Sequence, residues 1–122
     1  MKSKGALRQK LSERIAVLGA EFINVGATLE DNYNRLTAVC SAWNMAGHSA
    51  ETQQLQLNQY FESYKRTSPK SSDEDIALMR KDMESLIARK LKLFQNDHRQ
   101  IVSAYVVPAA NGYRIEVAAA IV

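Results

Sequence analysis

The side chains that could act as general bases are His48 and His98, the two histidines of the chain. A hydrolase of the triad type needs a nucleophile, a histidine base and an orienting acid that converge in space. Asp97 precedes His98 and could orient it, but neighbouring side chains on a helix or strand rarely face each other. The pair is therefore predicted to be a polar helix exit, and no catalytic residue is predicted.

Cys40 is the only cysteine, so no disulfide can form within the chain. It lies at helical spacing between Leu36 and Trp43, which predicts a small core side chain rather than a nucleophile. No CxxC, HxxxH or Glu-x-x-His spacing provides a metal site. The five scattered glycines form no phosphate-binding loop. We therefore expect no cofactor, no metal and a reducing, cytoplasmic location.

Basic and aromatic side chains indicate an alternative, a small nucleic-acid-binding accessory protein. Aromatic rings that stack on bases, next to cations that contact phosphates, could bind a single strand. The net charge of +3 is low for a dedicated nucleic-acid binder, and no recognition helix or RNP-type motif is present. The possible nucleic-acid contacts, in the basic N-terminal segment and the Tyr60–Arg66 segment, are Lys4, Arg8, Lys10, Tyr64, Lys65 and Arg66.

An apolar series keeps helical phase through the first third of the chain. Its average spacing is 3.6 residues, the period of an α-helix. The pattern fits one long helix that ends at Gly47, or two helices in which Gly26 closes the first and Thr28 caps the second. The unbroken phase favours the long helix, about 60 Å in length, which would overhang a monomer. The series is Leu7, Leu11, Ile15, Leu18, Phe22, Val25, Leu29, Tyr33, Leu36, Cys40 and Trp43.

Two further helices are predicted by their starting residues. Ser49 can cap a helix that runs to Thr67, with an inner face that includes Leu57 and Phe61. The segment Ser72-Asp-Glu-Asp75 is a capping box, and apolar residues at helical spacing follow it to residue 94. A Ser- and Pro-containing loop separates these two helices.

The last part of the chain predicts a β-hairpin. Residues 101–107 and 113–122 are rich in β-branched and aromatic side chains, and Asn111-Gly112 between them is typical of a type I′ turn. With these two as the turn residues, Ala110 lies opposite Tyr113 and Pro108 opposite Ile115. The apolar last strand then needs a cover or a pairing partner.

These patterns together predict a single α+β domain over residues 1–122, mainly α, helical over 4–96 with a hairpin over 100–122. The predicted function is a non-enzymatic protein-interaction or scaffold module that self-associates as a homodimer, with another protein as a further potential partner. No stretch is long and apolar enough to predict a membrane span. The predicted interface residues are Leu11, Leu18, Phe22, Val25, Leu29, Val117 and Ile121.

Overall fold

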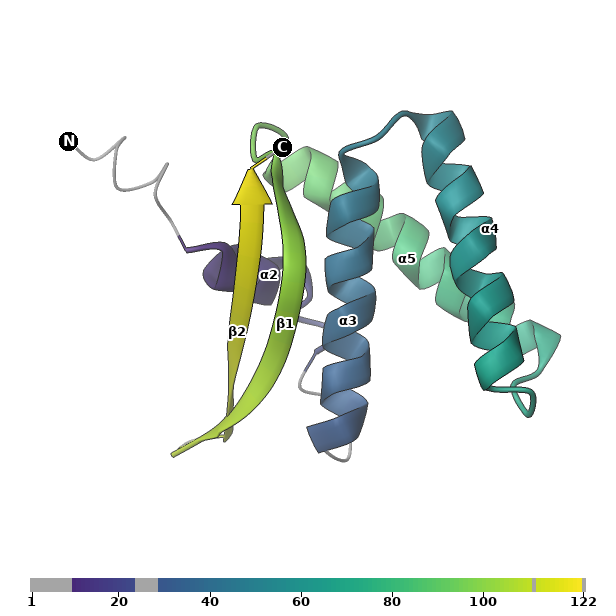
Figure 1. Ribbon diagram of the computed structural model, residues 1–122, viewed down its shortest axis with the longest axis horizontal. Coiled ribbons are helices and arrows are strands. Elements are labelled where there is room, and N and C mark those ends of the chain that lie inside the picture. Colours follow the sequence, from purple (N-terminus) through teal and green to yellow (C-terminus); the bar gives the residue numbers. More distant parts are fainter. Residues whose placement is uncertain (1–9, 24–28, 111, 122) are drawn as a thin grey trace.

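The computed structural model describes residues 10–23, 29–110 and 112–121. Four described helices precede two strands, and the labels follow Figure 1. This confirms a mainly α, α+β fold with a C-terminal hairpin. The elements are α2 (Leu11–Leu18), α3 (Leu29–Ala46), α4 (Ala50–Thr67), α5 (Asp73–Leu93), β1 (Arg99–Ala109) and β2 (Gly112–Ile121).

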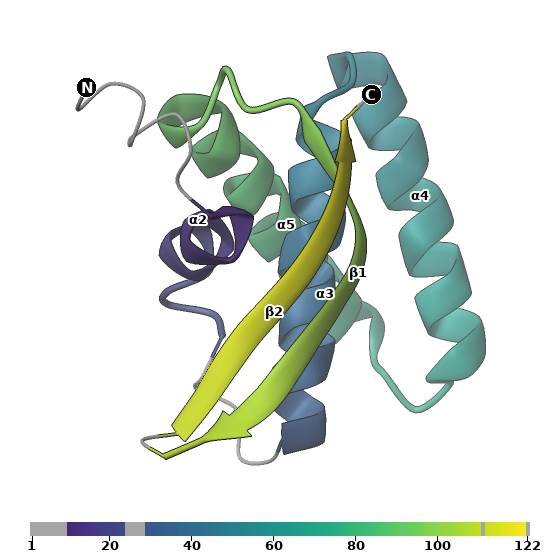
Figure 2. The same ribbon diagram turned by 60° about the vertical axis from the view of Figure 1, so that its left-hand side comes forward.

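Helix α3 lies at the centre of the molecule. The hairpin packs against one side of α3, α5 crosses another side, and α4 packs against both α3 and α5 (Figure 1). Helix α2 contacts β2, α3 and α5, so it joins the hairpin to the helical part (Figure 2). Every described helix contributes to one core, whose most buried side chains include Ile15, Leu36, Val39, Trp43, Leu57 and Met83.

The prediction of one continuous N-terminal helix is wrong. Helix α2 ends at Leu18, and the chain turns over residues 19–23, where the backbone N–H groups of Phe22 and Ile23 both donate to Gly19 O. The helical phase hid this break because α2 and α3 each bury their apolar stripe in the same core. The alternative break at Gly26, with Thr28 as the cap, lies outside the described residues.

Because α2 and α3 are separate helices, the prediction of a dimer can no longer be based on one helix of about 60 Å. Helix α3 has 18 residues and is therefore about 27 Å long, which matches the size of the domain. No described helix overhangs the molecule (Figure 1). A dimer is therefore not required to cover a projecting apolar stripe.

The predicted starts of α4 and α5 are confirmed. The Ser49 side chain accepts a hydrogen bond from Thr52 N, and the Ser72 side chain accepts one from Asp75 N. Each cap satisfies a backbone donor that has no partner within the helix. The stripe of α5 also faces the core as predicted, and its buried members are Met83, Leu86, Ile87 and Lys90.

The hairpin forms, but its predicted register is wrong. Pro108 pairs with Tyr113 rather than Ile115, and Ala109 pairs with Gly112. Turn chemistry was the only guide to register in the sequence, whereas the protein also positions β1 by tertiary contacts. The Asn44 side chain exchanges two hydrogen bonds with the backbone of Ile101, at 2.8 and 3.0 Å, and the register changes between Ile101 and Ser103. Val102 is therefore the extra residue of a β-bulge in β1.

Candidate functional site

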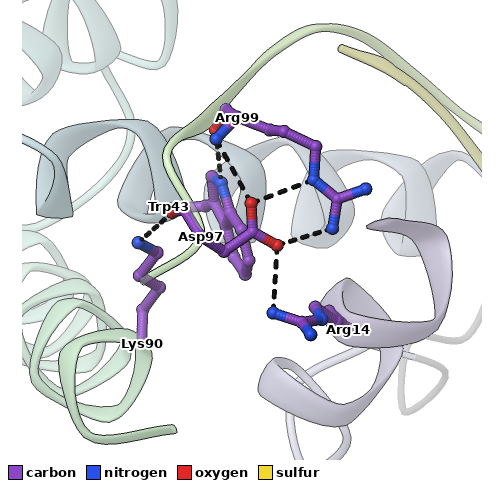
Figure 3. Close-up of polar contacts among 5 residues, drawn as sticks. All are labelled: Arg14, Trp43, Lys90, Asp97 and Arg99. Atoms are coloured by element: carbon purple, nitrogen blue, oxygen red, sulfur yellow. Dashed lines mark hydrogen bonds and ion pairs between the residues drawn. The ribbon is translucent and has the colours of Figure 1, made fainter. Parts of the chain in front are cut away.

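A buried carboxylate joins α2, the loop after α5 and β1. Asp97 lies in that loop, and its side chain is 5% exposed. Arg14 Nη1 on α2 donates to Asp97 Oδ2 at 3.2 Å, and Arg99 at the start of β1 donates from Nη2 to Oδ2 at 2.6 Å and from Nε to Oδ1 at 2.9 Å (Figure 3). The backbone N–H of Arg99 donates to Oδ1 as well. We call Arg14, Lys90, Asp97 and Arg99 the Asp97 cluster.

Lys90 is the fourth member of the cluster and is 2% exposed. It lies in the last turn of α5, and its Nζ donates to the backbone oxygen of Asp97 at 2.7 Å. Nζ also lies 4.8 Å from the centre of the Trp43 ring, and Trp43 Nε1 donates to Arg99 O at 2.8 Å. Lys90 and Trp43 thus fix the loop after α5 and the start of β1 against the core (Figure 3).

The Asp97 residue is in contact with three cations, Arg14, Lys90 and Arg99. Burial alone would raise the pKa of the Asp97 carboxyl, but hydrogen bonds from Arg99 and the charges of Arg99 and Arg14 outweigh burial and lower this pKa. Burial also lowers the pKa of Lys90; Arg14 adds to this shift and Asp97 opposes it. The cluster therefore favours the ionised form of the Asp97 carboxyl.

The two histidines meet at a pocket beside the cluster. His48 follows α3 and His98 precedes β1, and both line a pocket of about 270 Å³. Among the described contacts, the Asp97 carboxylate binds the two arginines and does not hydrogen-bond His98, so an acid-oriented base is not formed. The other residues that line the pocket are Trp43, Gly47, Lys90, Asp97, Arg99 and Gln100.

The remaining reactive side chain is in the core. Cys40 is buried, and its burial raises the pKa of the thiol to about 12. At neutral pH it stays a neutral thiol, which is a poor nucleophile. In the part of the chain that the structure describes, no group of His, Cys, Asp and Glu side chains could hold a metal ion.

The predicted interface residues lie in different environments. Leu11 and Leu18 are buried in the chain's own core, and Phe22 packs partly against this core with Arg35 over its ring. Val117 packs on the core from the inner face of the hairpin. Val25 lies outside the described residues, and of Leu29 and Ile121 only the backbone is described. The members whose side chains are described, Leu11, Leu18, Phe22 and Val117, therefore face the chain's own core.

The possible nucleic-acid contacts also lie apart. Lys10 is exposed at the start of α2, whereas the end of α4 lies on the opposite side of the molecule (Figure 1). At that end Tyr64 is half-buried, Lys65 Nζ pairs with Asp73 at 3.1 Å, and Arg66 is exposed. Lys4 and Arg8 lie outside the described residues. The described basic and aromatic groups thus do not form one continuous binding surface.

The outer face of the hairpin is exposed and mixes apolar side chains with the charged Glu116, which pairs with Tyr105. Val102 and Tyr105 on β1 are 67% and 58% exposed. On β2 the side chains of Ala118 and Ala120 are exposed too. The two strands pair only with each other in the described sheet, so each strand has one edge without a strand partner.

The Asp97 cluster was not predicted from the sequence. Its one detectable sign was Lys90, a lysine at an apolar position of the α5 stripe, where a buried cation needs an acceptor. The arginines gave no such sign because basic residues near helix ends are common on solvated surfaces.

Comparison with protein-family models, curated protein sequences and solved structures found no match. Among the described helices, none combines the length and the apolar character that crossing a bilayer requires. The Asp97 cluster, the pocket beside it and the hairpin are therefore the features from which a function can be inferred.

Proposed function

We propose that this protein is a non-enzymatic interaction module that forms a homodimer through the edge of β2. The observation that carries this proposal is the edge of β2, which has no strand partner in the described two-stranded sheet. Two copies of β2, antiparallel across a two-fold axis, would form a four-stranded sheet and pair the backbone groups of that edge. The buried Leu11 and Leu18 would then serve the fold of each copy rather than the contact between copies.

The edge of β2 is a better pairing surface than the edge of β1. Strand β1 contains the bulge at Val102, and it also contains Pro108, which has no backbone N–H to donate. Bulges and prolines are devices that block further strand pairing. Strand β2 has ten residues and neither device, and its small Ala118–Ala120 segment leaves the backbone accessible.

The dimer is tested by measuring molar mass with light scattering after size-exclusion chromatography at micromolar concentration. We expect twice the chain mass of 13.7 kDa. Ala118→Lys is expected to give a monomer, because a two-fold axis near the Ala118–Ala120 segment would bring the two added charges close together where the two β2 strands pair. Its circular dichroism spectrum should stay unchanged, since Ala118 is exposed.

Val102→Lys is the matched control, because it adds the same charge to the same sheet on the bulged strand. We expect this variant to remain dimeric. A monomeric wild-type protein would refute self-association, and a dimer lost only in Val102→Lys would exclude the edge of β2. We also propose a cytoplasmic location, since the single, buried Cys40 needs no oxidising compartment.

A further inference from the structure

We propose that the pocket lined by His48, Lys90, His98, Arg99 and Gln100 binds a small oxyanion, such as a phosphate group or a dicarboxylate. The pocket lies between the end of α3, the end of α5 and the start of β1. This inference is independent of self-association, because the pocket is built from residues of one chain.

The ammonium group of Lys90 is buried and lies at this pocket. An ammonium group has three N–H donors, and within the described part of the chain Nζ has one hydrogen-bond acceptor, Asp97 O. No described carboxylate lies within ion-pair distance of Nζ, because the Asp97 carboxylate is bound by Arg14 and Arg99. A buried cation without a paired anion is costly, and an anion in the adjoining pocket would offset that cost.

The cations at the pocket favour an anionic ligand. Lys90 and Arg99 both line the pocket. The carboxyl ends of α3 and α5 contribute partial negative charge nearby, equivalent to about half a charge each when fully effective. This partial charge is spread over exposed helix ends, whereas Lys90 is held at the pocket with 2% exposure. A bound oxyanion would give Lys90 an anionic partner.

The other lining side chains suit an oxyanion rather than an apolar ligand. His48 and His98 are exposed ring donors on two sides of the pocket, and Gln100 brings an amide donor. The Gln100 amide nitrogen lies close to Gly47, where an added Cβ would be 3.3 Å away. Gly47 therefore leaves room for this amide at the pocket. A volume of about 270 Å³ accommodates a phosphate group or a short dicarboxylate.

The site is tested by titrating the protein with inorganic phosphate and, separately, with succinate. Sodium chloride keeps the ionic strength constant, and nuclear magnetic resonance follows the backbone amides. We expect saturable shifts that are largest for residues 47–48 and 98–100. Binding of either probe supports the oxyanion site, and the comparison of the two probes identifies the preferred anion.

Lys90→Met removes the charge and keeps the length of the side chain. We expect it to weaken binding by at least about tenfold, which is the loss of one charge-assisted hydrogen bond. Lys92→Met is the matched control, because Lys92 is exposed in the same helical turn and does not line this pocket. Gln100→Glu provides a second test by adding negative charge at the pocket without changing a buried cation, and it should weaken binding as well.

Two results would overturn the proposal. The first is the absence of saturable shifts with both probes in the wild-type protein at low ionic strength. The second is an equal loss of binding in Lys92→Met and Lys90→Met, which would show a general attraction of anions to basic surface. If Lys90→Met does not fold, Gln100→Glu decides, and unchanged binding in Gln100→Glu would refute the site.

Discussion

Replacement of Asp97 by Asn is the most informative perturbation of the Asp97 cluster. The amide has nearly the shape of the carboxylate but carries no charge. The wild-type carboxylate accepts hydrogen bonds from Arg14 Nη1, from Arg99 Nε and Nη2, and from Arg99 N. In Asp97→Asn, one oxygen is replaced by an NH₂ group that cannot accept these bonds. Arg14 and Arg99 then lose their ion pairs with the Asp97 carboxylate.

The expected loss follows from the burial of these groups. The side chains of Arg14, Asp97 and Arg99 are 16%, 5% and 28% exposed, so solvent screens their interactions only partly. Breaking a buried ion pair by removing one partner costs about 3–5 kcal/mol. We expect about 3 kcal/mol for Asp97→Asn, at the lower end because Arg99 retains some exposure. For a chain of this length, the corresponding drop in Tm is roughly 10 °C.

The loss should depend on pH with a defined sign. The pKa of Asp97 is lower in the folded protein than its ordinary value, so this carboxylate stabilises the fold above the unfolded-state pKa of about 3.9. Its contribution is lost as pH falls through the lower, folded-state pKa. The difference in unfolding free energy between wild type and Asp97→Asn should therefore be full at pH 7 and shrink below about pH 4.

Urea unfolding followed by the fluorescence of Trp43 measures this difference, because Trp43 is the only tryptophan and is 1% exposed in the fold. Asp73→Asn is the matched control. Its ion pair with Lys65 is exposed, at 87% for Asp73 and 62% for Lys65, and should contribute less than about 1 kcal/mol. The reasoning fails if Asp97→Asn costs no more than Asp73→Asn at pH 7. It also fails if the cost of Asp97→Asn is the same at pH 3.

Three further predictions concern the core and its supports. Cys40 should react with a thiol reagent only at the rate of unfolding at pH 8, because its pKa is about 12 and it is buried; fast reaction of native protein would contradict this. Asn44→Ala should cost about 2 kcal/mol in urea unfolding, because it leaves the N–H and C=O of Ile101 without their side-chain partner, whereas a neutral effect would mean that water replaces both bonds. Gly19→Ala should destabilise by about 1–2 kcal/mol despite the higher helix propensity of alanine, because the added Cβ would lie 2.7 Å from Ile23 Cδ1; a higher Tm would show that Ile23 moves freely.

The parts of the fold that were predictable are those determined by local physics. Ser49 and Ser72 cap their helices because a side-chain oxygen satisfies backbone donors three residues away. The buried stripe of α5 follows from helical spacing alone. The hairpin follows from the β-branched residues on both sides of the Asn111-Gly112 turn signal.

The parts that were wrong depend on contacts between distant residues. Periodicity shows which side of a helix faces a core. It does not show whether two apolar segments belong to one continuous helix or to two separate helices that pack on the same core. At Gly19, where α2 ends, an added Cβ would lie 2.7 Å from Ile23 and 3.0 Å from Val39, and no local pattern reveals the closeness of Val39. The hairpin register also differs from the predicted one at the turn, where Ala109 pairs with Gly112, and the bulge at Val102 shifts it by one further residue. The prediction of candidate sites was limited in the same way. Lys90 could be recognised as a lysine at an apolar position of α5, whereas Arg14 and Asp97 are brought together only by folding.

The ion pair between Arg14 and Asp97 joins residues that are 83 positions apart. During synthesis at about 5–20 residues per second, Arg14 is made roughly 4–17 seconds before its carboxylate exists. For that interval α2 has neither Asp97 nor the strand β2 against which it packs. The first described helix should therefore be among the last to acquire its native contacts. A nascent chain stopped before residue 97 would contain α3 and α5 but would leave exposed the part of α2 that packs against β2.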